Sequence, residues 1–196
     1  MTQAKPRFKT IEEYLNYDDA TDTRYELVDG VLVEMGAEST LNTQIAVFLL
    51  LTFSRLGLPD ERLGVKQKIA VSDSKMTARE PDLIVHSVES EAAINGKSQA
   101  LLKFEMPAPL LVIEVVSPGN PGEENYERDY VEKPQEYAAR GITEFWQIDP
   151  QRSVVIVLNL KNGGDRSREF RGKEPVISPT FPNLQLIAEQ ILRARR

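Results

Sequence analysis

The chain has 196 residues, of which 41% are hydrophobic and 28% charged, which suits one globular domain over residues 1–196 and excludes global disorder. It has no cysteine, which excludes disulfides, thiolate zinc sites, iron–sulfur clusters and cysteine nucleophiles. The single histidine, His86, disfavours a multi-histidine metal site or a Ser-His-Asp triad. Any chemistry is therefore expected to use carboxylates, lysines, hydroxyls and a hard metal ion.

The net charge of −6 disfavours a protein that coats nucleic acid by bulk attraction. The charge is uneven, with 4 basic and 9 acidic side chains in residues 1–40 but 9 basic and 4 acidic in residues 151–196. Two interpretations of the basic end remain open, an ordinary solvated surface or a local patch that faces phosphate.

No targeting or membrane segment is expected. Residues Met1 to Lys9 are polar, and the longest apolar run, Ile45 to Leu51, is far shorter than the ~20 residues that span a bilayer. We expect a cytoplasmic protein with no membrane partner.

The first half of the chain begins with a capping box, Thr10-Ile-Glu-Glu13, which predicts a short helix to about Tyr17. The Asp29-Gly30 pair between two β-rich runs predicts a hairpin over residues 24–35. Helical apolar spacing from Thr40 to Leu56, followed by Gly57, predicts a longer helix.

The middle of the chain is rich in strand signals. Alternation over residues 63–71 predicts a half-exposed strand, and residues 80–85 predict another. Residues 87–100 are polar and predict a connection with one helical turn. The apolar, β-branched run of residues 110–116 predicts a central strand buried on both faces.

The last third predicts a helix over residues 126–140, which kinks or starts at Pro134. Further predicted elements are strands at 143–149 and 152–160, an Asn-Gly-Gly turn, a weaker strand near 169–170 and a helix over 183–192. The order predicts an α/β domain in which one mixed sheet is flanked by helices.

Glu114 is the most informative residue, because a carboxylate inside an apolar strand is costly to bury unless it is paired, protonated or metal-bound. A salt bridge or a solvent-facing edge would explain it, and so would a functional site. If the two strands are neighbours, Asp82 converges with Glu114 at one end of the sheet. Two carboxylates and a backbone carbonyl would suit Mg²⁺.

Asp129, Lys133 and Tyr137 are spaced to share one helical face. They could form an ordinary ion pair beside a packed tyrosine, or place a lysine over the carboxylates to orient water or hold a phosphate oxygen. Ser117 could donate to a phosphate, although Ser-Pro after a strand is usually a turn. His86 is expected to be a plain edge histidine.

Six motifs in order resemble the Uma-two family of restriction-endonuclease-like proteins within the PD-(D/E)XK nuclease fold, from about Ile11 to Leu192. They are Arg24-Tyr-Glu-Leu-Val-Asp-Gly30, Glu80-Pro-Asp-Leu-Ile-Val85, Ile113-Glu-Val-Val-Ser-Pro118, Arg128-Asp-Tyr-Val-Glu-Lys133, Tyr137-Ala138 with Gly141-Ile142, and Glu144-Phe-Trp-Gln-Ile-Asp149.

The resemblance implies a Mg²⁺-dependent endonuclease acting on DNA, in which Asp82 and Glu114 bind the metal and Mn²⁺ can substitute. The usual lysine position, two residues after the glutamate, holds Val116, so the lysine role passes to Lys133. Glu26 matches a family glutamate and would be an extra carboxylate. A homodimer is plausible, since cutting both strands of a duplex favours two sites.

Two other functions remain open at this stage. One is a non-catalytic module on the same fold that binds nucleic acid or a protein, which Val116 and the acidic net charge favour. The other is a two-carboxylate glycosidase, which the aromatic fraction of 7% disfavours.

Overall fold

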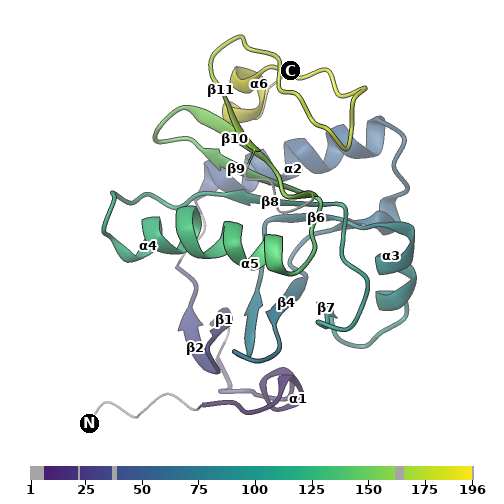
Figure 1. The fold of residues 1–196 in the computed structure, drawn as a ribbon, viewed down its shortest axis with the longest axis vertical. Helices are drawn as coiled ribbons and strands as arrows, with labels where there is room; N and C mark the ends of the chain where they lie inside the picture. Colours follow the sequence, from purple (N-terminus) through teal and green to yellow (C-terminus); the bar gives the residue numbers. More distant parts are fainter. Residues whose placement is uncertain (1–6, 22, 37–38, 162–165, 196) are drawn as a thin grey trace.

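The computed structural model describes residues 7–21, 23–36, 39–161 and 166–195, which form a mixed α/β fold with two sheets (Figure 1). The strands are β1 (Tyr25–Val28), β2 (Val31–Glu34), β3 (Leu63–Gly64), β4 (Lys68–Ser72), β5 (Thr77–Arg79), β6 (Leu83–Val85), β7 (Leu101–Leu102), β8 (Leu111–Val115), β9 (Glu144–Asp149), β10 (Val154–Asn159) and β11 (Arg166–Phe170). The helices are α1 (Ile11–Leu15), α2 (Thr40–Arg55), the 3₁₀ turn η1 (Asp60–Arg62), α3 (Val88–Ile94), α4 (Glu124–Glu127), the π-helix η2 (Arg128–Glu132), α5 (Lys133–Ala139) and α6 (Ala188–Leu192).

The larger sheet has six strands in the order β11-β10-β9-β8-β6-β3, which places β8 in its interior. Strand β8 runs parallel to β9 and antiparallel to β6. Because side chains alternate along a strand, Leu111, Ile113 and Val115 pack with α2 and α6, whereas Val112 shares the opposite face with Tyr137 of α5. The sheet is thus covered by helices on both faces (Figure 1).

The smaller sheet has the order β2-β1-β5-β4-β7 and carries the hairpin of β1 and β2. The chain leaves this sheet after β5 and enters β6 of the larger sheet only four residues later. Helix α5 contacts both sheets, since Ile69 and Val71 of β4 belong to the same buried cluster as Tyr137. The segment from Arg79 to Asp82 therefore lies at the junction of the two sheets.

Several predicted elements are confirmed. Thr10 and Glu13 make both hydrogen bonds of the capping box, and the hairpin pairs in the expected register around Asp29 and Gly30. The long helix ends at Arg55, with Gly57 at a φ of +95°. All five residues of β8 are buried, as expected of a central strand.

Other predictions are wrong in detail. The strands form two sheets rather than one, because the predicted strand of residues 63–71 breaks at Lys66, where φ is +54°, and its halves join different sheets. The predicted strand over 80–85 begins only at Leu83, and β5 and β7 were not foreseen. The predicted connection over 87–100 contains the seven-residue helix α3.

Towards the C-terminus, the predicted helix over 183–192 forms only from Ala188 to Leu192. The predicted Asn-Gly-Gly turn at residues 162–164 lies outside the described residues. His86 is not an edge histidine, because it is fully buried and its ring nitrogens contact Gln67 and Ser90. No helix in the described part of the chain is long and apolar enough to cross a bilayer.

Substitution of Gly30 tests whether its close approach to Phe8 stabilises the hairpin that carries Glu26. Its φ is +76°, and an added Cβ would lie 2.7 Å from the carbonyl oxygen of Phe8. Gly30→Ala should lower the free energy of unfolding by about 1–2 kcal/mol because of the left-handed backbone. The clash with Phe8 should lower it further. Gly96→Ala is the matched control, since Gly96 has a φ of +70° but open space around it. Urea unfolding should show the greater loss for Gly30→Ala, and equal losses would contradict the role of the close approach.

Candidate active site

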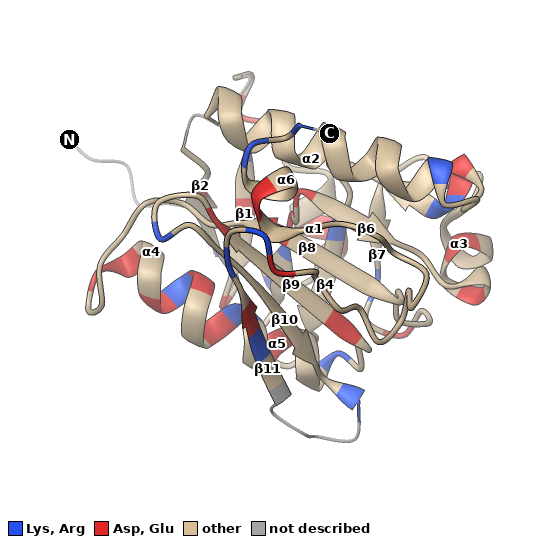
Figure 2. Ribbon diagram, turned by 90° about the horizontal axis from the view of Figure 1, so that it is seen from above, with Lys and Arg blue, Asp and Glu red and all other residues tan. Residues whose placement is uncertain are grey.

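The helix that carries Asp129 and Lys133 has a π-helical turn between α4 and α5, and acidic and basic residues are interleaved along it (Figure 2). The amide of Lys133 donates to the carbonyl of Arg128, five residues back, instead of to Asp129. Pro134 has no N–H to offer in its place. The carbonyl of Asp129 instead accepts a hydrogen bond from the Gln147 side chain of β9. The irregular turn is therefore fastened to the larger sheet at Asp129.

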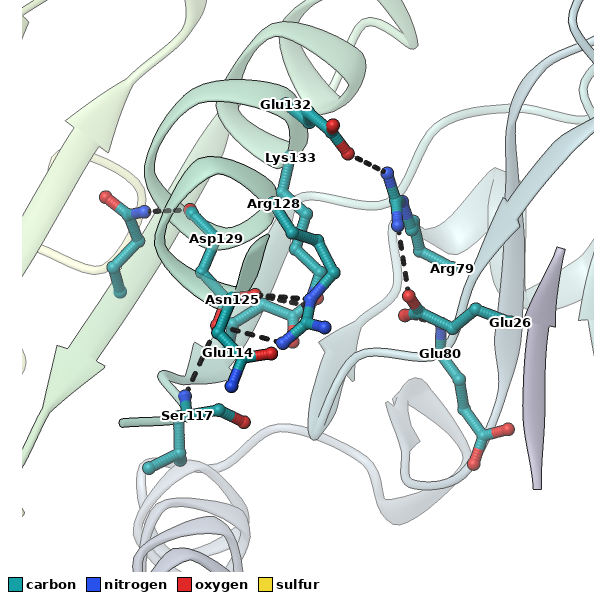
Figure 3. A network of polar contacts seen from close by, with 12 residues as sticks. Glu26, Arg79, Glu80, Glu114, Ser117, Asn125, Arg128, Asp129, Glu132 and Lys133 are labelled. Carbon is teal, nitrogen blue, oxygen red and sulfur yellow. Dashed lines mark hydrogen bonds and ion pairs between the residues drawn. The ribbon is translucent and has the colours of Figure 1, made fainter. Parts of the chain in front are cut away.

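Glu114 lies near the end of β8 and points toward this helix (Figure 3). Its Oε2 lies 2.9 Å from the ammonium Nζ of Lys133, and its Oε1 accepts a hydrogen bond of 2.6 Å from the Tyr137 hydroxyl. The same ammonium lies 3.2 Å from Oδ1 of Asp129. The structure thus brings Glu114, Asp129, Lys133 and Tyr137 into one buried group.

Asp82 lies directly before β6, beside the end of β8. The antiparallel register pairs Leu83 with Ile113, so the next residues outward are Asp82 and Glu114. Oδ2 of Asp82 accepts a 2.7 Å hydrogen bond from the amide of Val115, which fixes its carboxylate at the strand end. The two carboxylates therefore line the same cavity from neighbouring strands.

The smaller sheet supports the group through Arg79, whose side chain is fully buried. Its guanidinium contacts Glu26 of β1 at 3.1 Å and Glu132 of η2 at 3.0 Å (Figure 3). It also lies 2.7 Å from Glu136 of α5. Glu26 also accepts the amide of Glu80 at 3.1 Å. Arg79 thus ties the hairpin to the helix that presents Lys133.

Ser117 and Arg128 complete the surroundings of Asp129. The Ser117 amide donates to Oδ2 of Asp129 at 3.3 Å, and Nε of Arg128 donates to Oδ1 at 3.1 Å. The part of Ser117 in contact with Asp129 is its backbone, so Asp129 holds the loop after β8 against the helix.

The cavity between these groups has a volume of about 140 Å³. This is smaller than the ~300–1,000 Å³ of typical small-molecule sites, so it can take an ion, water and one substrate group. Its charged lining consists of Glu26, Glu34, Glu80, Asp82, Glu114, Asp129, Arg128 and Lys133. Carboxylates outnumber basic side chains in this lining, which favours the binding of a cation in the cavity.

Electrostatics reflect this excess of carboxylates. Burial raises the pKa of Glu114 to about 8; Lys133 opposes the shift, and Asp82, Glu26 and Asp129 add to it. Burial acts to lower the pKa of Lys133, but Glu114, Glu26 and Asp129 outweigh it and raise that pKa. Lys133 therefore stays protonated at neutral pH.

Asp82 and Glu114 are the carboxylates that could hold a divalent metal ion. Within the described ranges, no group of three or more His, Cys, Asp or Glu side chains is arranged to hold a metal ion alone. Mg²⁺ needs no such cage, since it commonly binds one or two carboxylates and fills its other positions with water and substrate oxygens.

All the sequence-selected residues meet around this cavity, although Tyr137 lies behind it and Ser117 contributes a backbone contact. Sequence reasoning singled out none of Arg79, Arg128 and Gln147 as a site residue. Arg128 and Gln147 stand within two of the six motifs and Arg79 directly precedes a third, so a place in or next to a motif was the available signal.

The fold is that of the restriction-endonuclease-like class. A solved structure titled as a putative nuclease belonging to DUF820 from Anabaena variabilis matches with a TM-score of 0.71 at 17% identity, covering 94% of this chain and 98% of that chain. The family model Uma2, described as "Putative restriction endonuclease", matches residues 11–189, and the chain belongs to this family. No curated protein matches the chain.

The raised pKa of Glu114 predicts a pH-dependent stability in metal-free buffer. Its folded pKa of about 8 lies above the ordinary value of 4.5. Its contribution to the free energy of unfolding is therefore complete below about 4.5 and is lost as pH rises through about 8. Glu114→Gln should lack this loss.

Urea titrations at a series of pH values measure the effect. Glu89→Gln, at an exposed position of α3, is the matched control and should follow the wild type. Parallel pH profiles for the wild type and Glu114→Gln would contradict the assignment.

Proposed function

We propose that the chain is a divalent-metal-dependent nuclease that hydrolyses phosphodiester bonds in DNA. The observation that carries the proposal is the protonated Lys133 ammonium, held 2.9 Å from Glu114 in a carboxylate-lined cavity that also contains Asp82. Membership of a family described as "Putative restriction endonuclease" supports the same reaction class.

In this proposal Asp82 and Glu114 would hold Mg²⁺, for which Mn²⁺ could substitute. Bound there, the ion would supply Lewis-acid polarisation of the phosphate and would activate water at neutral pH. The positive charge of the ion would also offset the excess of carboxylates, because a nearby cation favours the ionised form of Glu114.

In this proposal Lys133 provides electrostatic stabilisation through its positive charge. An ammonium with a raised pKa is a poor proton acceptor, so it does not serve as a general base. It stabilises the negative charge that develops on the attacked phosphate. Asp129 and Glu114 hold the ammonium, and Tyr137 holds Glu114, so these three contacts orient Lys133 and Glu114.

A non-catalytic module on the same fold is the second candidate. Both oxygens of Glu114 already have protein partners, Lys133 and Tyr137, so the group satisfies itself without substrate. Such a module would bind nucleic acid or a protein without cleaving it. A homodimer remains a proposal that accompanies cleavage of both strands.

Removal of the Lys133 charge tests the catalytic proposal. Lys133→Met should reduce cleavage of supercoiled plasmid in Mg²⁺ or Mn²⁺ by about 10²-fold or more, as for other donors to transition-state charge. Methionine keeps much of the apolar stem, and Lys97→Ala, at an exposed position, is the control. Thermal melts of each variant separate loss of activity from loss of fold.

Two outcomes would count against the proposal. Wild-type rates in a folded Lys133→Met would remove lysine from the mechanism. No cleavage of supercoiled, linear or single-stranded DNA by the wild type would favour the non-catalytic module.

Metal binding is tested separately by thermal stability. A ligand that binds only the native state stabilises it, by about 2.7 kcal/mol when its concentration is 100 times Kd. Mg²⁺ should therefore raise the Tm of the wild type, and Asp82→Asn should lose most of that rise. Asp73→Asn, in an exposed turn, makes the same change outside the cavity and should retain it. An unchanged rise in Asp82→Asn would place the ion elsewhere.

A further inference from the structure

Helix α2 has two apolar sides, and the core uses only one of them. The side that faces the larger sheet is fully buried and consists of Ile45, Leu49 and Phe53. On another side of the same helix, Leu41, Val47 and Leu51 remain 37%, 50% and 42% exposed. Single exposed apolar residues are ordinary, but a contiguous group of them is typical of an interaction site.

The charge pattern of α2 agrees with this interpretation. A helix at a protein surface normally carries charged residues on its outer face, but α2 has none from Thr40 to Ser54 (Figure 2). Leu41, Phe48 and Leu51 are spaced by seven and three residues, the spacing at which helices pack against one another. The exposed side of α2 therefore has the pattern of a helix that packs against a neighbour.

A groove of about 870 Å³ lies between this side of α2 and the end of α6. Leu192 and Ala194 line it from the α6 side, and both pack against the core that also holds α2. Because both walls are anchored in the same core, the groove is a fixed part of the fold.

The charged residues that line the groove in the described part of the chain are all arginines, namely Arg55, Arg193 and Arg195. Arg193 is paired with Glu189 at 2.8 Å, whereas Arg55 and Arg195 form no ion pair with a described residue. These two positive charges stay available to a partner, on a chain whose net charge is −6.

Charge complementarity specifies the chemistry of the occupant. The leucines and Val47 need apolar side chains opposite them, and the arginines need carboxylates. An amphipathic helix with an acidic polar side supplies both, and such helices bind apolar grooves through residues spaced three and four apart. A second copy of this groove would bring more arginines, and a nucleic acid backbone would leave the apolar floor without a partner.

We propose that the groove between α2 and the end of α6 binds an acidic amphipathic helix of a partner protein. The inference does not depend on the proposed nuclease function, since the described residues that line the groove and those that line the cavity at Glu114 are different. The bound helix would nevertheless lie on α2, whose first turn lines that cavity.

The probe is a fluorescein-labelled peptide of about 18 residues, long enough to form a helix, with leucine at spacings of three and four and glutamate on the other sides. A matched peptide has lysine in place of every glutamate. Fluorescence anisotropy with the full chain should show about tenfold higher affinity for the glutamate peptide. The negative net charge of the protein acts in the opposite sense, so this preference reports on the groove.

Variants of exposed residues locate the binding. Val47→Glu places a carboxylate in the groove and should weaken binding of the glutamate peptide about tenfold or more. Val88→Glu is the matched control, since Val88 is 63% exposed on α3, outside the groove, and it should bind as the wild type does. The double variant Arg55→Gln and Arg195→Gln should reduce the preference for the glutamate peptide about threefold or more. Thermal melts check that each variant is folded.

Three results would overturn the proposal. The first is that the wild type does not bind the glutamate peptide, or that Val47→Glu binds it equally well. The second is a wild-type dimer in light scattering that Val47→Glu converts to a monomer, which would assign the groove to a second copy of the chain. The third is displacement of the glutamate peptide by a DNA duplex in metal-free buffer, which would assign the groove to nucleic acid.

Discussion

The buried contact between the Lys133 ammonium and the Glu114 carboxyl group is the interaction on which the candidate site depends. Both side chains are 7% exposed, and one lies on a helix and the other on a central strand. A buried charge that loses its partner costs ~3–5 kcal/mol, so the helix and β8 must stay in register. Arg79 applies a similar constraint from the smaller sheet, because its guanidinium joins Glu26 to the helix. The cavity lies between β1, β8 and the helix that these contacts hold together.

Much of the fold could be predicted because local signals agreed with long-range packing. Helix α2 and strand β8 have strong patterns, and the turn at Gly30 has its own sequence signature. The division into two sheets had no such signal. It depends on Lys66 adopting a left-handed conformation and on the short strand β5, whose last residue, Arg79, reads as a surface residue but is buried. Only tertiary ion pairs make that burial possible.

The candidate site was predictable where a charged residue interrupts an otherwise apolar sequence pattern. Glu114 interrupts an apolar strand, which marked it, and the spacing of Lys133 and Tyr137 marked one helix face. Partners that act through an ordinary polar side chain could not be found this way. Gln147 matters because Pro134 leaves the carbonyl of Asp129 without a helical donor, and that follows from the π-helical turn rather than from residue type.

The π-helical turn gives up regular helical hydrogen bonds in a helix that carries residues of the candidate site. Such a turn is equivalent to one residue inserted into an α-helix. Loss of one residue there, for example the 40% exposed Val131, would let the turn relax into regular helix and recover ordinary hydrogen bonds. It would also shorten the spacing of Asp129 and Lys133 from four residues to three and so change the geometry of their ion pair. Such turns are frequent at functional sites, and here the turn places Asp129 in contact with both Lys133 and Gln147.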